Sequence, residues 1–153
     1  MTTAQKADRE ISLEEIDEAN LGKPFYVERV TPTAIRVVNI EGTPRLEVSY
    51  TGSAMLNGIN VTDFGTYQEQ RSEKGSFYSE GRGVLRADDS ETATYVSHTV
   101  GHSNKDGKWI DHGTLIFRAP PDVTLSFLNN LIAVFKDEAP KGRSGLVKVW
   151  KWE

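Results

Sequence analysis

Residues 76–120 decide the fold, and they read SFYSEGRGVLRADDSETATYVSHTVGHSNKDGKWIDHGTLIFRAP. Three runs rich in Val, Ile, Thr, Phe and Tyr are separated by polar turn clusters at residues 88–90 and 103–107. Such side chains fit a pleated, half-buried surface, and connections this short join antiparallel neighbours. The stretch therefore predicts a three-stranded antiparallel meander.

Further strands are predicted on both sides of this meander. Asn57-Gly58 is a strong hairpin signal, because both residues tolerate the positive φ of a tight turn. Pro32 is expected to interrupt the first part of the sheet, since proline belongs at strand ends, edges or bulges. The further strands are expected at residues 25–30, 34–40, 46–56, 59–71, 131–136 and 146–152, with a short helical turn near residues 126–128.

Closure of the sheet follows from its size. Eight or nine evenly spaced strands in an open sheet would leave exposed edges, which closure removes. We therefore expect an all-β protein, a single antiparallel barrel of eight to nine strands over residues 11–153. Residues 1–10 are expected to be disordered, and Ser12 with Glu15 forms a capping box that predicts a short N-terminal helix.

Composition excludes several classes of partner. The chain has 153 residues, a net charge of −4 and no cysteine, so disulfides and cysteine-based metal sites are excluded. The sequence has no stripe of basic residues of the kind that binds nucleic acid. No apolar run reaches the roughly 18 residues of a membrane-spanning helix. The first residues lack the apolar segment of a signal peptide, so we expect a cytoplasmic protein.

Two segments resemble a known group. They are GINVTDFGTY at residues 58–67 and the ending FLNNLIAVFK…KVWKWE from residue 127 to residue 153. With the order of short strands, they are similar to small bacterial and archaeal proteins of the allene oxide cyclase barrel-like group, over about residues 40–153. The resemblance implies an eight-stranded barrel with an internal apolar pocket and no cofactor, and it implies either cyclase activity or binding of a small apolar molecule. No catalytic motif of the cyclases aligns with this chain, so the resemblance assigns no catalytic residue.

One row of polar residues could carry acid–base chemistry. If the loops at residues 72–75, 88–90 and 103–107 each fall between strands, Tyr67, Glu80, His98 and His112 lie side by side across four strands. Arg82 then shares their face. A carboxylate beside imidazoles is a plausible proton donor and acceptor pair, so Glu80 and His98 are the candidate catalytic residues.

The sequence leaves open which face of the sheet lines the barrel. A slip of one residue in any hairpin would move every side chain of a strand to the other face. In the alternative, the row is a solvated outer surface, because polar residues usually lie outside. The opposite face resembles a core, and its large side chains are Phe77, Leu85, Tyr95, Trp109, Leu115 and Phe117.

The function expected first is binding of a small apolar, lipid- or polyketide-like molecule inside the barrel, without a cofactor. The candidate ligand-binding residues are Tyr67, Arg82, His112, Tyr95 and Trp109. The alternative is a cofactor-free cyclase or isomerase that uses Glu80 and His98. We expect no metal, because His98 and His102 lie about 13 Å apart along one strand. His98 and His112 could share a metal, but Glu80 would then have to be the third ligand.

Two apolar features allow association or packing. Ile110 and Ile116 share one face of their strand while Trp109 lies on the other, so the outer face needs a cover, either the N-terminal helix or another subunit. One short helix spans little area, so we expect a homo-oligomer. Trp150 and Trp152 share a strand face, where they either pack at the barrel end or form a ligand platform.

Overall fold

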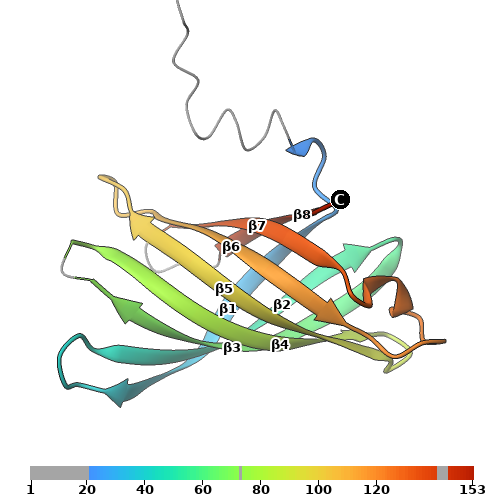
Figure 1. Cartoon of the computed structure of the whole chain (residues 1–153), viewed down its shortest axis with the longest axis horizontal. Coiled ribbons are helices and arrows are strands. Elements are labelled where there is room, and N and C mark those ends of the chain that lie inside the picture. The colour runs from blue at the N-terminus through green and yellow to red at the C-terminus, as the bar shows by residue number, and fades with distance from the viewer. Residues whose placement is uncertain (1–20, 73, 141–144) are drawn as a thin grey trace, which may run out of the picture.

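The computed structural model describes residues 21–72, 74–140 and 145–153. They form a closed antiparallel barrel in which each strand pairs with its neighbours in the chain and β1 pairs with β8 (Figure 1). The strands are β1 (Tyr26–Asn39), β2 (Arg45–Leu56), β3 (Ile59–Arg71), β4 (Ser76–Ala87), β5 (Thr92–Ser103), β6 (Trp109–Arg118), β7 (Ile132–Ala139) and β8 (Gly145–Lys151). The expected closed barrel and its meander of β4, β5 and β6 are confirmed.

The tight turns form where the sequence predicts them. Asn57 and Gly58 both have positive φ, and Leu56 pairs directly with Ile59 across the two-residue loop. The loop between β4 and β5 is closed by the hydrogen bond from the Ala87 amide to the Glu91 carbonyl at 2.9 Å. These two hairpins set the register of β2 with β3 and of β4 with β5.

The two strands predicted around Pro32 are a single strand. β1 runs through this proline with a shift of register between Pro32 and Ala34, so the missing N–H falls at an irregularity of the ladder. β7 also continues three residues beyond its expected end at Lys136. The short helical turn is confirmed as the 3₁₀ helix η1 (Ser126–Leu128).

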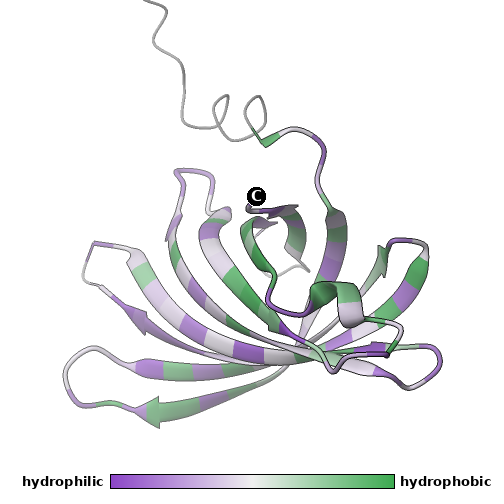
Figure 2. Ribbon diagram, turned by 45° about the vertical axis from the view of Figure 1, so that its right-hand side comes forward, coloured by the Kyte–Doolittle hydropathy of each residue, from purple (hydrophilic) through white to green (hydrophobic). Residues whose placement is uncertain are grey.

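The inner face carries the core. Hydrophobic and hydrophilic residues alternate along much of the strands, as Figure 2 shows, and alternate residues of a strand point to opposite faces. Apolar side chains fill the end of the barrel near η1, where Leu125 and Leu128 are fully buried against Phe117 and Leu85. Of the two faces that the sequence left open, the one with Phe77, Leu85 and Phe117 is the interior. Trp150, by contrast, lies on the outer face, where its indole N–H donates to the Gly22 carbonyl at 2.9 Å.

The expected disordered N-terminus and capped helix both fall within residues 1–20, outside the described part of the chain. In the ranges that the structure describes, no helix has the length and apolar character needed to cross a membrane.

Candidate functional site

The candidate catalytic pair lies on the outer surface of the barrel. Glu80 and His98 are direct cross-strand partners, as predicted, and the Tyr78 hydroxyl donates to Glu80 at 2.7 Å and lies 3.1 Å from His98 Nδ1. However, the side chains of Glu80 and His98 are 63% and 55% exposed. The expectation of an acid–base pair inside the barrel is therefore wrong in its location, because these positions alternate with the inward-facing residues of β4 and β5. A catalytic role for the two residues stays a prediction.

Register explains why the expected row does not form. Ser72, rather than Arg71, pairs with Ser76, and this slip of one residue turns Tyr67 inward and places Gln68 opposite Glu80. The loop after β5 closes between Asn104 and Lys108, a slip of two residues. His112 therefore keeps the outer face but lies opposite Val100 instead of His98.

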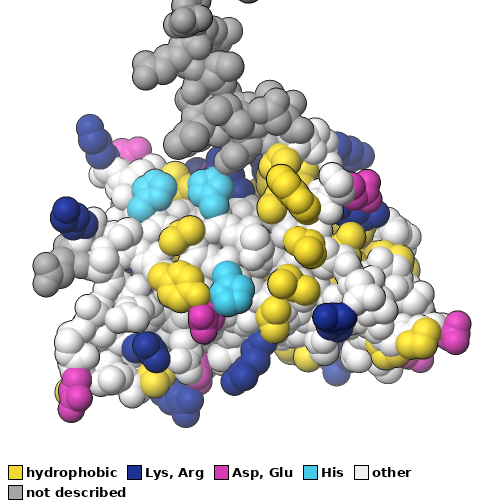
Figure 3. Space-filling model, in the orientation of Figure 1, with side chains coloured by type: hydrophobic (Ala, Val, Ile, Leu, Met, Phe, Trp, Pro, Cys, Tyr) yellow, Lys and Arg dark blue, Asp and Glu magenta, His cyan; other side chains and the backbone are white. Residues whose placement is uncertain are grey.

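The other candidate ligand residues divide between the two faces of the sheet. Arg82 points outward, whereas Tyr95 and Trp109 point into the barrel. All three histidines lie on the outer surface near apolar side chains, as Figure 3 shows. Within the described residues, no group of three or more His, Cys, Asp or Glu could hold a metal ion.

A buried polar cluster occupies the middle of the barrel. The Tyr95 hydroxyl lies 3.0 and 2.9 Å from the two carboxylate oxygens of Asp63 and is also hydrogen-bonded to the Tyr50 hydroxyl. Glu28 is 4% exposed beside Asp63, and one of its carboxyl oxygens has no hydrogen-bond partner. Burial, reinforced by the charge of Asp63, raises the pKa of Glu28 well above its ordinary value, so this carboxyl holds a proton at neutral pH.

A second acidic pair lies at the barrel end remote from η1. Asp111 and Asp137 are cross-strand partners on the inner face, and each has one buried oxygen without a hydrogen-bond partner. Burial, followed by the charges of Asp137 and Glu69, raises the pKa of Asp111 to about 8. Burial, followed by the charge of Glu138, raises the pKa of Asp137 to about 6. The interior is thus apolar at one end and acidic at the other, unlike the uniformly apolar pocket that the resemblance implies.

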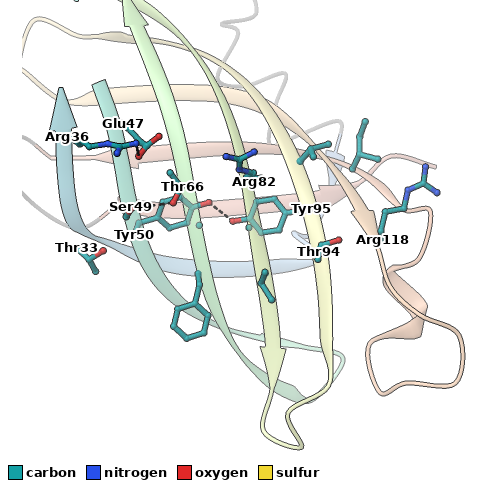
Figure 4. A pocket seen from close by; sticks show the side chains of 16 residues that line it. Thr33, Arg36, Glu47, Ser49, Tyr50, Thr66, Arg82, Thr94, Tyr95 and Arg118 are labelled. Atoms are coloured by element: carbon teal, nitrogen blue, oxygen red, sulfur yellow. Dashed lines mark hydrogen bonds and ion pairs between the residues drawn. The ribbon is translucent and has the colours of Figure 1, made fainter. Parts of the chain in front are cut away.

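An outer groove with a volume of about 1020 Å³ is lined by residues of β1 through β6 (Figure 4). Its centre is a row of outward side chains that are neighbours from strand to strand across β2 to β6. The row consists of Ser49, Thr66, Arg82, Val96 and Ile116. Phe64 and Val84 flank the row, so an apolar surface lies on either side of one central arginine.

Two glycines form the floor of this outer groove. Gly65 and Gly83 are cross-strand partners, and a Cβ added to them would lie 2.1 Å from the Tyr50 ring and 2.3 Å from the Tyr95 ring, respectively. The two rings thus fill the inner side of the wall where the glycines have no side chain, as Figure 4 shows from the groove side. The absence of side chains here lets the buried tyrosine cluster approach the floor of the groove.

The outer groove has an excess of positive charge, with three arginines and one glutamate among its lining residues. Glu47 is bound by the Arg36 guanidinium at 2.7 Å and by the Gln68 amide at 3.0 Å, and these partners lower its pKa. Arg118 donates to Asn130. Arg82 lies at the centre of the groove and makes neither of these hydrogen bonds, but its charge contributes to the lowered pKa of Glu47.

Two solved proteins share this fold. No protein-family model matches the chain, and no curated protein matches it. A protein of unknown function from Clostridium acetobutylicum ATCC 824 superposes with a TM-score of 0.72 at 12% identity, over 86% of this chain and 98% of its own. A conserved protein of unknown function from Rhodopseudomonas palustris superposes with a TM-score of 0.68 at 12% identity, over 84% of this chain and 95% of its own. The likeness establishes the barrel fold, and neither protein points to the allene oxide cyclase group in particular.

Sequence reasoning missed both the acidic interior and the outer groove. A signal for the first was present, because strict alternation along β3 puts Asp63 on the same face as Val61 and Gly65. No comparable signal existed for the groove, since its hollow depends on how six strands curve in space.

Proposed function

We propose that the protein binds a small amphipathic molecule with one anionic group, and that the outer groove is the binding site. This is the class of function expected from the sequence, a small-molecule-binding barrel. The proposed site, however, lies on the outer face of the sheet instead of inside the barrel. The observation that supports this is Arg82 at the centre of the groove, with the apolar side chains of Phe64, Val84, Val96 and Ile116 around it. A lipid-derived carboxylate is an example of the ligand class.

The geometry suggests how such a ligand would lie. Its anionic group pairs with the Arg82 guanidinium, which suits carboxylates because its N–H groups form a planar fork. Its apolar body covers Val96 and Ile116 on one side, or Phe64 and Val84 on the other. The volume of the groove, about 1020 Å³, lies near the upper end of the usual range for small-molecule sites.

Dodecanoate below its micelle-forming concentration is a suitable probe, and we expect Arg82→Gln to weaken its binding roughly tenfold, which corresponds to about 1.4 kcal/mol. Isothermal titration calorimetry measures the change. Dodecyltrimethylammonium has the same chain with a cationic group, and we expect it to bind much more weakly than dodecanoate to the parent protein.

Arg29→Gln is the matched control, since it removes the same charge from an exposed position of β1 that does not line the groove. We expect it to leave dodecanoate affinity within about twofold of the parent, because a distant surface charge is screened by salt. Equal losses for Arg29→Gln and Arg82→Gln, or equal binding of the two surfactants, would contradict the proposal.

A further inference from the structure

The second half of β1 has a free edge. β1 pairs with β8 only from Tyr26 to Val30, whereas its pairing with β2 continues to Asn39. Among the described residues, no strand pairs with the other side of residues 33–39. In Figures 1 and 2 this part of β1 forms the outermost strand of a ribbon that projects from the barrel. Backbone groups along such an edge are available to another strand.

Among the residues that the structure describes, this segment and Ile40, which follows it, carry the most exposed group of large aliphatic side chains. Ile35 is 68% exposed, Val37 59%, Val38 42% and Ile40 77%. A contiguous apolar segment of this kind in a folded protein generally marks an interaction site. The free backbone edge and the exposed side chains therefore indicate the same surface.

Little on this edge opposes strand pairing. Natural edge strands are commonly protected by charged side chains. Here Arg36 is the one charged residue between positions 33 and 40, and it forms an ion pair with Glu47 of the same chain at 2.7 Å. Pro32, which cannot donate a hydrogen bond, lies before the free segment rather than within it. The edge is thus long, apolar and electrically neutral.

We propose that residues 33–39 pair in antiparallel fashion with the same residues of a second copy of this chain, joining two barrels through one continuous sheet. Antiparallel pairing of a strand with itself has two-fold symmetry, so one surface supplies both halves of the interface. In this register the two Arg36 residues lie opposite each other at the two-fold axis, and each forms an ion pair with Glu47 of its own chain at 2.7 Å, so the two edges meet without net charge. A charged partner would find no unmatched charge here.

The area is sufficient for a specific but modest dimer. Four side chains of this size and exposure contribute roughly 400 Å² per copy, or about 800 Å² for the pair. The paired backbones and the neighbouring side chains of β2 add to this, which brings the interface to the lower end of specific protein–protein interfaces, about 1,200 Å². We therefore expect dissociation in the micromolar range.

Ile35→Lys tests the proposal, because it would place like charges close together across the two-fold axis. Sedimentation equilibrium of the full chain should show a dimer for the parent and a dissociation constant raised roughly hundredfold or more for the variant. Val100→Lys is the matched control, since Val100 is 62% exposed on the outer face of β5, away from the edge. We expect it to dimerise like the parent, and circular dichroism should show that all three proteins are folded.

Hydrogen exchange identifies what covers the edge. In the proposed dimer, amides within residues 33–39 exchange slowly at high protein concentration and faster on dilution, while the ladder of β4 and β5 does not change. Protection independent of concentration would mean that the chain covers its own edge, and would overturn the proposal. A monomeric parent would also overturn it, as would a dimer disrupted by Val100→Lys but not by Ile35→Lys.

Discussion

Gly83→Ala should lower the free energy of unfolding by about 3 kcal/mol, one of the two largest effects that we expect. The new methyl group would lie 2.3 Å from the Tyr95 ring, so this ring must move. Tyr95 is 5% exposed, and its hydroxyl is hydrogen-bonded to Asp63. Displacing the ring therefore breaks buried hydrogen bonds, and this cost adds to the cost of overpacking the core. Urea denaturation with an unchanged m value measures the loss.

A double-mutant cycle separates this clash from a general effect of alanine in the strand. Tyr95→Val removes the ring, so Gly83→Ala in that background should cost much less than in the parent. Thr94→Ala, an exposed substitution opposite Val84, is the control and should change the free energy of unfolding by less than about 0.5 kcal/mol. Additive effects of Gly83→Ala and Tyr95→Val would show that the tight fit is unimportant.

Stability should fall as the pH rises from about 5 to about 8. The pKa of Asp111 is raised to about 8 and that of Asp137 to about 6, while both groups titrate near 3.9 in the unfolded chain. Across this window the native state holds protons that the unfolded chain has released, so each rise in pH favours unfolding. Below the unfolded pKa both states are protonated, and the penalty disappears.

Asp111→Asn should remove the part of this dependence that Asp111 contributes, while Asp137 and Glu28 keep their own parts. The amide stays neutral, so the variant should be more stable than the parent by about 2–3 kcal/mol at pH 8, with a smaller difference at pH 5. Urea denaturation at each pH measures the free energy of unfolding. The control is Asp106→Asn in the exposed loop after β5, which should have the same free energy of unfolding as the parent at every pH. Two results would contradict the raised pKa values of this buried pair. One is a free energy of unfolding of the parent that rises from pH 5 to pH 8, and the other is an Asp111→Asn variant that is less stable than the parent at pH 8.

The local patterns of the sequence predicted the fold well because they depend on short-range chemistry. Asn57-Gly58 fixed one hairpin, and the three-residue loop at residues 88–90 correctly placed Glu80 opposite His98. Alternation separated the face with Phe77, Leu85 and Phe117 from the polar face, but it left open which of the two lines the barrel, and the structure shows that the first one does. Pro32 misled the prediction because a bulge accommodates a proline that would otherwise end a strand.

The site was predicted poorly because its residues depend on register summed over several hairpins. A difference of one residue in the loop after β3 moved Tyr67 from the outer face to the inner face. A difference of two residues after β5 left His112 on the expected face but beside Val100. Such errors are small in the sequence, yet each one changes which side chains meet.

Closure of the barrel by β1 and β8 also bears on how the chain folds. The contact from Tyr26 to Val149 joins residues more than a hundred positions apart, whereas every other strand pairs with the next one along the chain. The seven hairpin-type pairings can form soon after each strand leaves the ribosome, but the ring cannot close until β8 has emerged. Until then the whole length of β1 has an unpaired edge, and nascent chains on one polysome would expose these edges close to one another. Ring closure should therefore be the slow step of folding, and the interval before it is when pairing between neighbouring chains competes most strongly with completion of the barrel.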